Sequence, residues 1–204
     1  MRNVIATKST SLALAEERKL MRQGYEFLDE KRMLLASEIL RQLTVYKVCV
    51  AEMETARRAA AAALAAAIER HGLEELQLTA PLSELRAPQW KRTLFLRAAL
   101  LQIVEDDETA VVPARTQDAS PEVQACRDTF TRVVRIAARA ATIAANLRRL
   151  AAEYRRTERR AKTLENVLLP EVEETLKYVN EELDASDQEE LVHTRSPRRS
   201  ESER

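Results

Sequence analysis

The residue types that most often do chemistry in proteins are few in this chain. Its two histidines, His71 and His193, lie near predicted helix ends and far from any paired nucleophile. The chain has no glycine-rich phosphate loop and no cysteine–histidine metal pattern. The acidic run 105–108 is a weak metal candidate, because adjacent carboxylates without an ordered loop usually form a solvated turn. The sequence therefore predicts a non-catalytic protein with no cofactor and no metal.

Charges that could bind a partner are concentrated in the C-terminal half. Between residues 132 and 162, ten basic residues accompany only Glu153 and Glu158, whereas between 163 and 190 Lys177 alone accompanies ten acids. The basic belt has no interleaved aromatic residues and no groove-binding module, so nucleic acid is the least favoured partner. A solvated face and docking against acidic protein partners are the other two interpretations.

Helices must carry these charges, and the apolar spacing predicts a coiled coil. From 126 to 168 apolar residues recur every seven positions. A second column of residues, also spaced by seven, lies between these positions. It ends at Val172 and Val179, and Glu158 and Glu165 interrupt its apolar residues. A neighbouring column widens the stripe beyond a minimal dimer seam, and it consists of Ile136, Ile143, Leu150 and Leu164.

The N-terminal region repeats the heptads from about residue 7 to residue 70, and either Thr7 or Ser9 begins the helix. Gly72 is predicted to end it, in the usual place for a C-terminal glycine. Four prolines then punctuate the following segment. Within it, 93–97 and 100–104 form either two short strands or one amphipathic helix, since short apolar runs do not distinguish them.

Prolines also mark the second long helix. Pro121 opens it with Ser120 as the cap, and Pro170 removes a backbone donor, which predicts a bend or kink near Asn166. Residues 191–204 are predicted to be a disordered tail.

Two cysteines and the absence of targeting segments suggest the compartment. No apolar run approaches the roughly 20 residues that cross a bilayer, and the first residues lack the apolar stretch of a secretory signal. Cys49 and Cys126 fall on seam positions, and an antiparallel pairing separates them by about 24 Å along the axis, which excludes a disulfide. We expect a soluble, cytoplasmic, reduced chain.

These patterns predict an all-α fold. The expected architecture is a long antiparallel two-helix coiled-coil hairpin with a small irregular head, either a short β-hairpin or short helices, between the two helices. Its expected parts are an N-terminal long helix (1–71), a central head (72–120), a C-terminal long helix (121–190) and the tail (191–204).

Two ordered motifs carry a family resemblance. The segment 6–12 followed by 22–35, with Gly24 and Lys31-Arg32, resembles the opening of the D subunit of V-type and archaeal-type ATPases. The segment 157–170 followed by 175–179 resembles the corresponding C-terminal motif of that family. The match covers about residues 6–70 and 125–190, while the acidic end after Tyr178 and the head depart from the family pattern.

The resemblance implies a central-stalk rotor shaft that couples ATP synthesis or hydrolysis to proton or sodium transport. Its implied partners are the catalytic A and B subunits of a hexamer, the F subunit, and the socket that the C (d) subunit forms on the membrane ring. The chain would be peripheral to the membrane on its cytoplasmic side, not inserted. The alternative is a self-associating coiled-coil scaffold. The residues that the resemblance places against partners are Thr7, Lys8, Gly24, Lys31, Arg32, Thr157, Arg159, Arg160, Lys162, Leu164, Glu165 and Pro170.

Overall fold

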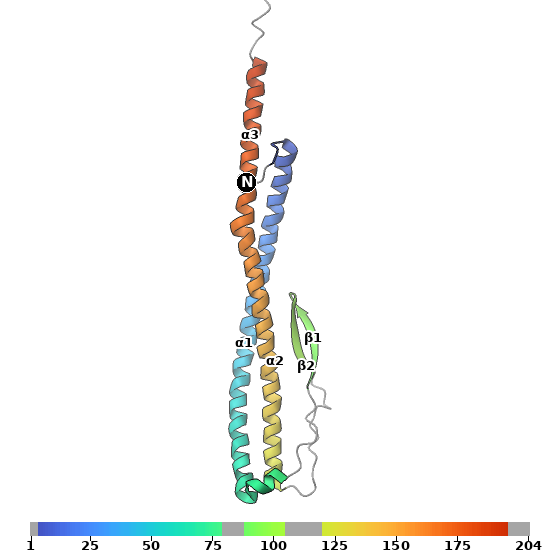
Figure 1. Cartoon of the computed structure of the whole chain (residues 1–204), viewed down its shortest axis with the longest axis vertical. Coiled ribbons are helices and arrows are strands. Elements are labelled where there is room, and N and C mark those ends of the chain that lie inside the picture. The colour runs from blue at the N-terminus through green and yellow to red at the C-terminus, as the bar shows by residue number, and fades with distance from the viewer. Residues whose placement is uncertain (1–3, 79–87, 105–119, 196–204) are drawn as a thin grey trace, which may run out of the picture. The chain divides into compact units, whose positions relative to one another are not determined.

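The computed structural model describes residues 4–78, 88–104 and 120–195. Its elements, in chain order, are α1 (Lys8–Leu78), β1 (Gln89–Phe95), β2 (Ala98–Val104), α2 (Pro121–Thr163), the π-helical turn η2 (Leu164–Leu168) and α3 (Leu169–Arg195) (Figure 1). The predicted all-α class with a small head between two long helical stretches is confirmed. The ambiguous apolar runs of the head are strands.

Contacts divide the chain into two units. The first unit comprises 1–33 and 155–204, and the second comprises 34–154. Helix α1 contributes its N-terminal part to the first unit and the remainder to the second. The expected division into 1–71, 72–120, 121–190 and 191–204 follows the order of elements along the chain, whereas the two units follow the contacts between them.

Both long helices begin at side-chain caps. The hydroxyl of Thr7 accepts a hydrogen bond from the Thr10 amide at 3.2 Å, so α1 begins after Thr7 and not after Ser9. At the start of α2, the Ser120 hydroxyl accepts from the Val123 amide at 3.4 Å, ahead of Pro121. The predicted cap at Ser120 is confirmed.

The ends of the helices differ from the prediction. Gly72 has φ 76° and ψ 158°, so it interrupts α1, but helical residues continue to Leu78. Helix α3 continues to Arg195, so the disorder predicted for the tail is wrong for residues 191–195. The rest of that tail and the acidic run 105–108 lie outside the described residues.

In the second unit, α1 and α2 pack antiparallel around two clusters. Cys49 and Ala56 of α1 pack with Ile136 and Ala140 of α2. The Cys49 thiol also lies 3.6 Å from the Ile136 carbonyl oxygen, and both cysteines of the chain are free thiols. The second cluster joins both helices to β2, and it consists of Leu35, Leu150, Ala98 and Leu100.

The first unit has its own antiparallel core. Leu14 of α1 packs against Val172, Leu176 and Val179 of α3. Val179 has no exposed surface, and burying an aliphatic side chain of this size contributes about 1.5–3 kcal/mol. Each unit therefore has an apolar core to which both long stretches of helix contribute.

One of the two buried columns of α2 and α3 differs from the pair expected from constant heptads, whereas the column that includes Ala140 and Ala161 is the expected one. Phe130, in the expected alternate column, is exposed, whereas the neighbouring column that includes Ile136 and Leu150 is buried. Across η2 both buried columns advance by eight residues instead of seven. The first column is Ile136, Ile143, Leu150, Thr157, Leu164, Val172 and Val179, and the second is Ala140, Leu147, Tyr154, Ala161, Leu168, Leu176 and Leu183.

The turn η2 supplies this extra residue just before Pro170. The Leu169 amide donates to the Leu164 carbonyl, five residues back, which is the hydrogen bond of a π turn. A proline in a regular α-helix clashes with the carbonyl four residues earlier, here that of Asn166, and a widened turn accommodates the ring. The interruption predicted near Asn166 therefore takes the form of a one-residue bulge.

The head is an antiparallel hairpin whose register pairs Gln89 with Val104 and Phe95 with Ala98. Its two-residue turn, Leu96-Arg97, has φ of 47° and 75°. Positive φ at both central residues matches the right-handed twist of a hairpin, but Asn-Gly is the usual sequence there. Leu96 nevertheless packs against the core cluster of the second unit, so burial offsets the strain.

Replacing Arg97 with glycine is expected to stabilise the hairpin by about 1 kcal/mol, because glycine adopts positive φ without a steric penalty. Hydrogen exchange of the β1 and β2 amides measures the local stability. The matched control is Ala99→Gly, at an exposed strand position, which should destabilise the hairpin. Faster exchange in Arg97→Gly than in the wild type would contradict a strained turn.

Candidate partner-binding surface

All twelve residues that the sequence placed against partners lie in the first unit. Lys31 is only 8% exposed and Thr157 only 2% exposed, so neither side chain presents a docking surface. Gly24, Arg32 and Leu164 are half-buried. The exposed members are Thr7, Lys8, Arg159, Arg160, Lys162, Glu165 and Pro170.

Several exposed members interact within the chain. Thr7 caps α1, and the Lys8 ammonium lies 3.7 Å from an Asp187 carboxylate oxygen. Lys162 pairs with Glu158 at 3.0 Å, one helical turn earlier. Exposed pairs of this kind contribute little to stability, about 0–1 kcal/mol, so their charges remain available to a partner.

The two buried or half-buried cations have different surroundings. The Arg32 guanidinium donates to the Asp29 carboxylate three residues earlier. Lys31 is buried, so it lies on the packed side of α1 and not on the exposed face where a partner would meet it. Lys31 therefore acts inside the unit.

Glu165 has an intramolecular partner that sequence reasoning missed. The negative charge of Glu165, together with a hydrogen bond from the Tyr25 hydroxyl, raises the pKa of Tyr25. The two residues lie on different helical segments, so no spacing rule along one helix could have suggested the pair. This contact joins α1 to the π turn.

Among the twelve residues, Arg159 and Arg160 are the exposed cations for which the described part of the chain offers no ion-pair partner. Among residues 4–78, 88–104 and 120–195 neither forms an ion pair, although the Arg159 carbonyl accepts from the Thr163 hydroxyl at 2.9 Å. An unpaired exposed guanidinium keeps its five donors for an incoming carboxylate. These adjacent arginines, one turn before η2, are the strongest docking candidates of the twelve.

Gly24 does not need to be a glycine for packing inside the chain. A Cβ added there would lie 3.8 Å from Leu164 Cδ1, an ordinary van der Waals distance. We expect Gly24→Ala to raise the free energy of unfolding by about 1 kcal/mol, because alanine is the better helix former. Denaturant titration followed by circular dichroism measures this change, with Ala13→Gly in the same helix as the control of opposite sign. Destabilisation by Gly24→Ala would show that the site is tighter than this distance indicates.

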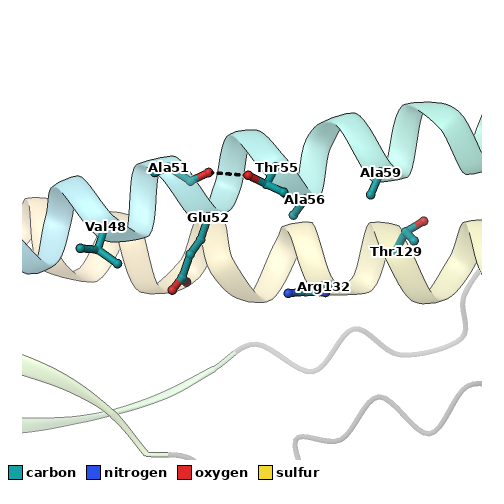
Figure 2. A pocket seen from close by; sticks show the side chains of 8 residues that line it. All are labelled: Val48, Ala51, Glu52, Thr55, Ala56, Ala59, Thr129 and Arg132. Atoms are coloured by element: carbon teal, nitrogen blue, oxygen red, sulfur yellow. Dashed lines mark hydrogen bonds between the residues drawn. The ribbon is translucent and has the colours of Figure 1, made fainter.

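A groove of about 450 Å³ lies between α1 and α2 in the second unit (Figure 2). Alanines line much of it, and its hydroxyls are occupied, since Thr55 donates to the Ala51 carbonyl and Thr129 to the Ala125 carbonyl. Its Glu52 pairs with Arg139 at 3.0 Å. The groove therefore results from small side chains and holds no nucleophile activated by a base.

Neither a metal centre nor a membrane span is found in the described part of the chain. No group of three or more histidine, cysteine, aspartate or glutamate side chains there could hold a metal ion. No helix among those residues is long and apolar enough to cross a membrane.

Comparison with known proteins identifies the family. The model of the family described as the D subunit of ATP synthase matches residues 10–196. The chain belongs to this family. The match runs through the head, which the two sequence motifs alone had left unaligned.

Curated relatives span nearly the whole chain. The V-type ATP synthase D subunit of Thermotoga neapolitana is 25% identical over 93% of this chain and 94% of its own length. The A-type ATP synthase D subunit of Thermococcus sibiricus is 29% identical over 90% of this chain and 87% of its own. A V-type ATP synthase D subunit of Treponema pallidum is 26% identical over 90% and 88%. The resemblance inferred from the motifs is confirmed.

Proposed function

We propose that the chain is the central rotor shaft of a V/A-type rotary ATPase. In this role it couples ATP synthesis or hydrolysis in a hexamer of A and B subunits to proton or sodium transport. The observation that carries the proposal is the family match over residues 10–196, which includes both long helical stretches. The chain itself is non-catalytic, and nucleotide binds to other subunits.

The first unit supplies the surface for the hexamer. Two of its exposed arginines, Arg159 and Arg160, form no ion pair with a described residue, and they offer guanidinium groups to carboxylates lining the A and B subunits. The acid-rich helix α3 follows them in the chain. Positive charges near the end of α2 are therefore followed by negative charges along α3. The F subunit and the socket formed by the C (d) subunit are the other proposed partners. The complex is peripheral to the membrane on its cytoplasmic side.

A scaffold that self-associates through its seam is less well supported. Such a scaffold needs a free apolar seam, whereas Leu35, Leu150 and Val179 have no exposed surface within the single chain. The seam positions are already filled by the chain's own helices. Light scattering of the purified chain separates the two functions, because a shaft is a monomer when isolated.

Exchanging Arg159 and Arg160 for glutamate is expected to weaken assembly with the A and B subunits by about tenfold or more, because attraction to carboxylates becomes repulsion. Circular dichroism should show an unchanged fold, since both side chains are exposed. Reconstitution of the complex and its ATPase rate are the measurements.

The matched control reverses Arg57 and Arg58, which are also exposed and adjacent but pair with Glu54. It makes the same change in net charge at a different surface. Equal loss of assembly in both double variants, or no loss in either, would mean that Arg159 and Arg160 form only a solvated face.

A further inference from the structure

The head hairpin is fixed at one edge by a side chain of α2. The Asn146 amide accepts a hydrogen bond from the Leu101 N–H at 2.8 Å and donates to the Leu101 carbonyl at 2.7 Å. A side-chain amide thus takes the place that a neighbouring strand would occupy. The outer edge of β2 is satisfied at Leu101.

The opposite edge, that of β1, has no neighbouring strand among the residues that the structure describes. Leu101 lies across from Arg92, and both backbone groups of Leu101 bond to Asn146, so the two residues form a non-hydrogen-bonded pair of the ladder. The N–H and C=O of Arg92 therefore point away from β2, as do those of Trp90 and Leu94, two residues to either side. No partner for these outward groups is found in the part of the chain that the structure describes.

The side chains at this edge are apolar and basic. Leu94 is 82% exposed and Trp90 50% exposed, and the alternation of a strand places them on one face with Arg92. Residues 88–104 include Lys91, Arg92 and Arg97 but no acidic residue. None of these three cations forms an ion pair with a described residue.

We propose that the β1 edge accepts an extended acidic segment of a partner protein as a third strand. The segment's backbone bonds to the outward groups of Trp90, Arg92 and Leu94, its carboxylates pair with Lys91 and Arg92, and its apolar side chains cover Leu94. Strand addition at an open sheet edge is an established form of peptide recognition, with affinity from backbone hydrogen bonds and specificity from alternate side chains.

The occupant is not a second copy of this chain. Edge-to-edge pairing of two β1 strands would bring like cations into opposition, which is destabilising. Lysines at a sheet edge prevent such self-pairing in many proteins. That function does not explain why leucine and tryptophan are exposed on the same strand, whereas binding of a partner does. The proposal is independent of the rotor role, since it concerns the second unit and names only the chemistry of the partner.

Amide hydrogen exchange resolved to single residues tests the proposal on the native assembly, recovered with the tagged full chain from its own cells. The isolated chain is the reference. The outward amides of Trp90, Arg92 and Leu94 should exchange at least about tenfold more slowly in the assembly. The amides of Lys91 and Thr93, which bond to β2, should be protected in both samples.

Two variants separate the backbone bond from the charge. Arg92→Pro removes the outward N–H but no bond to β2, and Arg92→Thr removes the same charge while keeping the N–H. We expect Arg92→Pro to retain the edge-bound partner about three- to tenfold less well than Arg92→Thr. The fluorescence of Trp90, the single tryptophan of the chain, shows whether the hairpin persists in each isolated variant.

Slowed exchange at the three outward amides, with a loss specific to Arg92→Pro, supports the proposal. Unchanged exchange there in an assembly that protects other surfaces overturns it. Recovery of the chain as a monomer alone, or as a homodimer that Arg92→Pro disrupts, overturns it as well. Whether A and B subunits are present in the recovered material tests the rotor role separately.

Discussion

Replacing Leu150 with alanine is expected to lower the free energy of unfolding by about 3–4 kcal/mol. Leu150 has no exposed surface and packs with Leu35 of α1 and Leu100 of β2. Its truncation leaves a cavity where both long helices and the hairpin meet, a site with little freedom to collapse. Denaturant titration followed by circular dichroism measures the change.

Leu147→Ala is the matched control, because Leu147 lies one turn earlier in the neighbouring column and is half-buried. Its truncation should cost about 1 kcal/mol, since less apolar surface leaves contact. Comparable costs for the two variants would show that Leu147 is buried as fully as Leu150, and a larger cost at Leu147 would contradict the deeper burial of Leu150.

Replacing Asn146 with alanine should release the head hairpin from α2. The change removes both hydrogen bonds to Leu101 and leaves its backbone groups without partners, at a cost of about 2–4 kcal/mol. The Trp90 indole, which donates to the Thr142 hydroxyl at 3.2 Å one turn away, should become more mobile and more exposed. Trp90 emission and exchange of the Leu101 amide are the measurements.

Arg149→Ala provides the control. Its guanidinium makes a longer bond, 3.3 Å, to the same Asn146 oxygen but none to the hairpin backbone in the described contacts. This variant should change Trp90 emission little. An unchanged exchange rate of the Leu101 amide in Asn146→Ala would refute the anchoring role and would also remove the basis for assigning the open edge to β1.

Much of the helical fold could be predicted from the sequence, because heptads and caps are local signals. Ser120 and Pro121 fix the start of α2, and Gly72 marks a true interruption of α1. The head was less predictable. Short apolar runs suit strands and helices equally, and Leu96-Arg97 gives no sign of a tight turn, since only burial of Leu96 makes its positive φ tolerable.

One of the two columns of the seam was assigned wrongly for a related reason. A constant heptad count places Val172 and Val179 in line with Glu158 and Glu165, which then look like interruptions. Both glutamates in fact lie beside the seam, and Thr157 occupies the buried column despite its hydroxyl. The presence of Pro170 was visible in the sequence. The extra residue that accommodates the proline could not be seen there, because it arises from a change in the backbone hydrogen bonds of the turn before it.

The candidate site could be predicted only in part. The motifs selected residues that all lie in one unit, but a motif does not state whether a side chain faces a partner or the chain's own core. Lys31 and Thr157 face the core, whereas Arg159 and Arg160 face outward. The role of Asn146 was missed because its side-chain amide bonds to a strand far along the chain. No sequence spacing predicts which residue of a helix will make such a contact.

The one-residue bulge at Leu164–Leu168 also limits how this protein can be recombined with its relatives. A graft that takes α2 from this chain and the following helix from a donor without the bulge would be out of frame by one residue at the junction. Every later side chain would then be rotated by about 100°, the angle between successive helical residues, and the donor residues at the positions of Val172 and Val179 would leave the core. Any such graft must take η2 and α3, which contains Pro170, from the same chain.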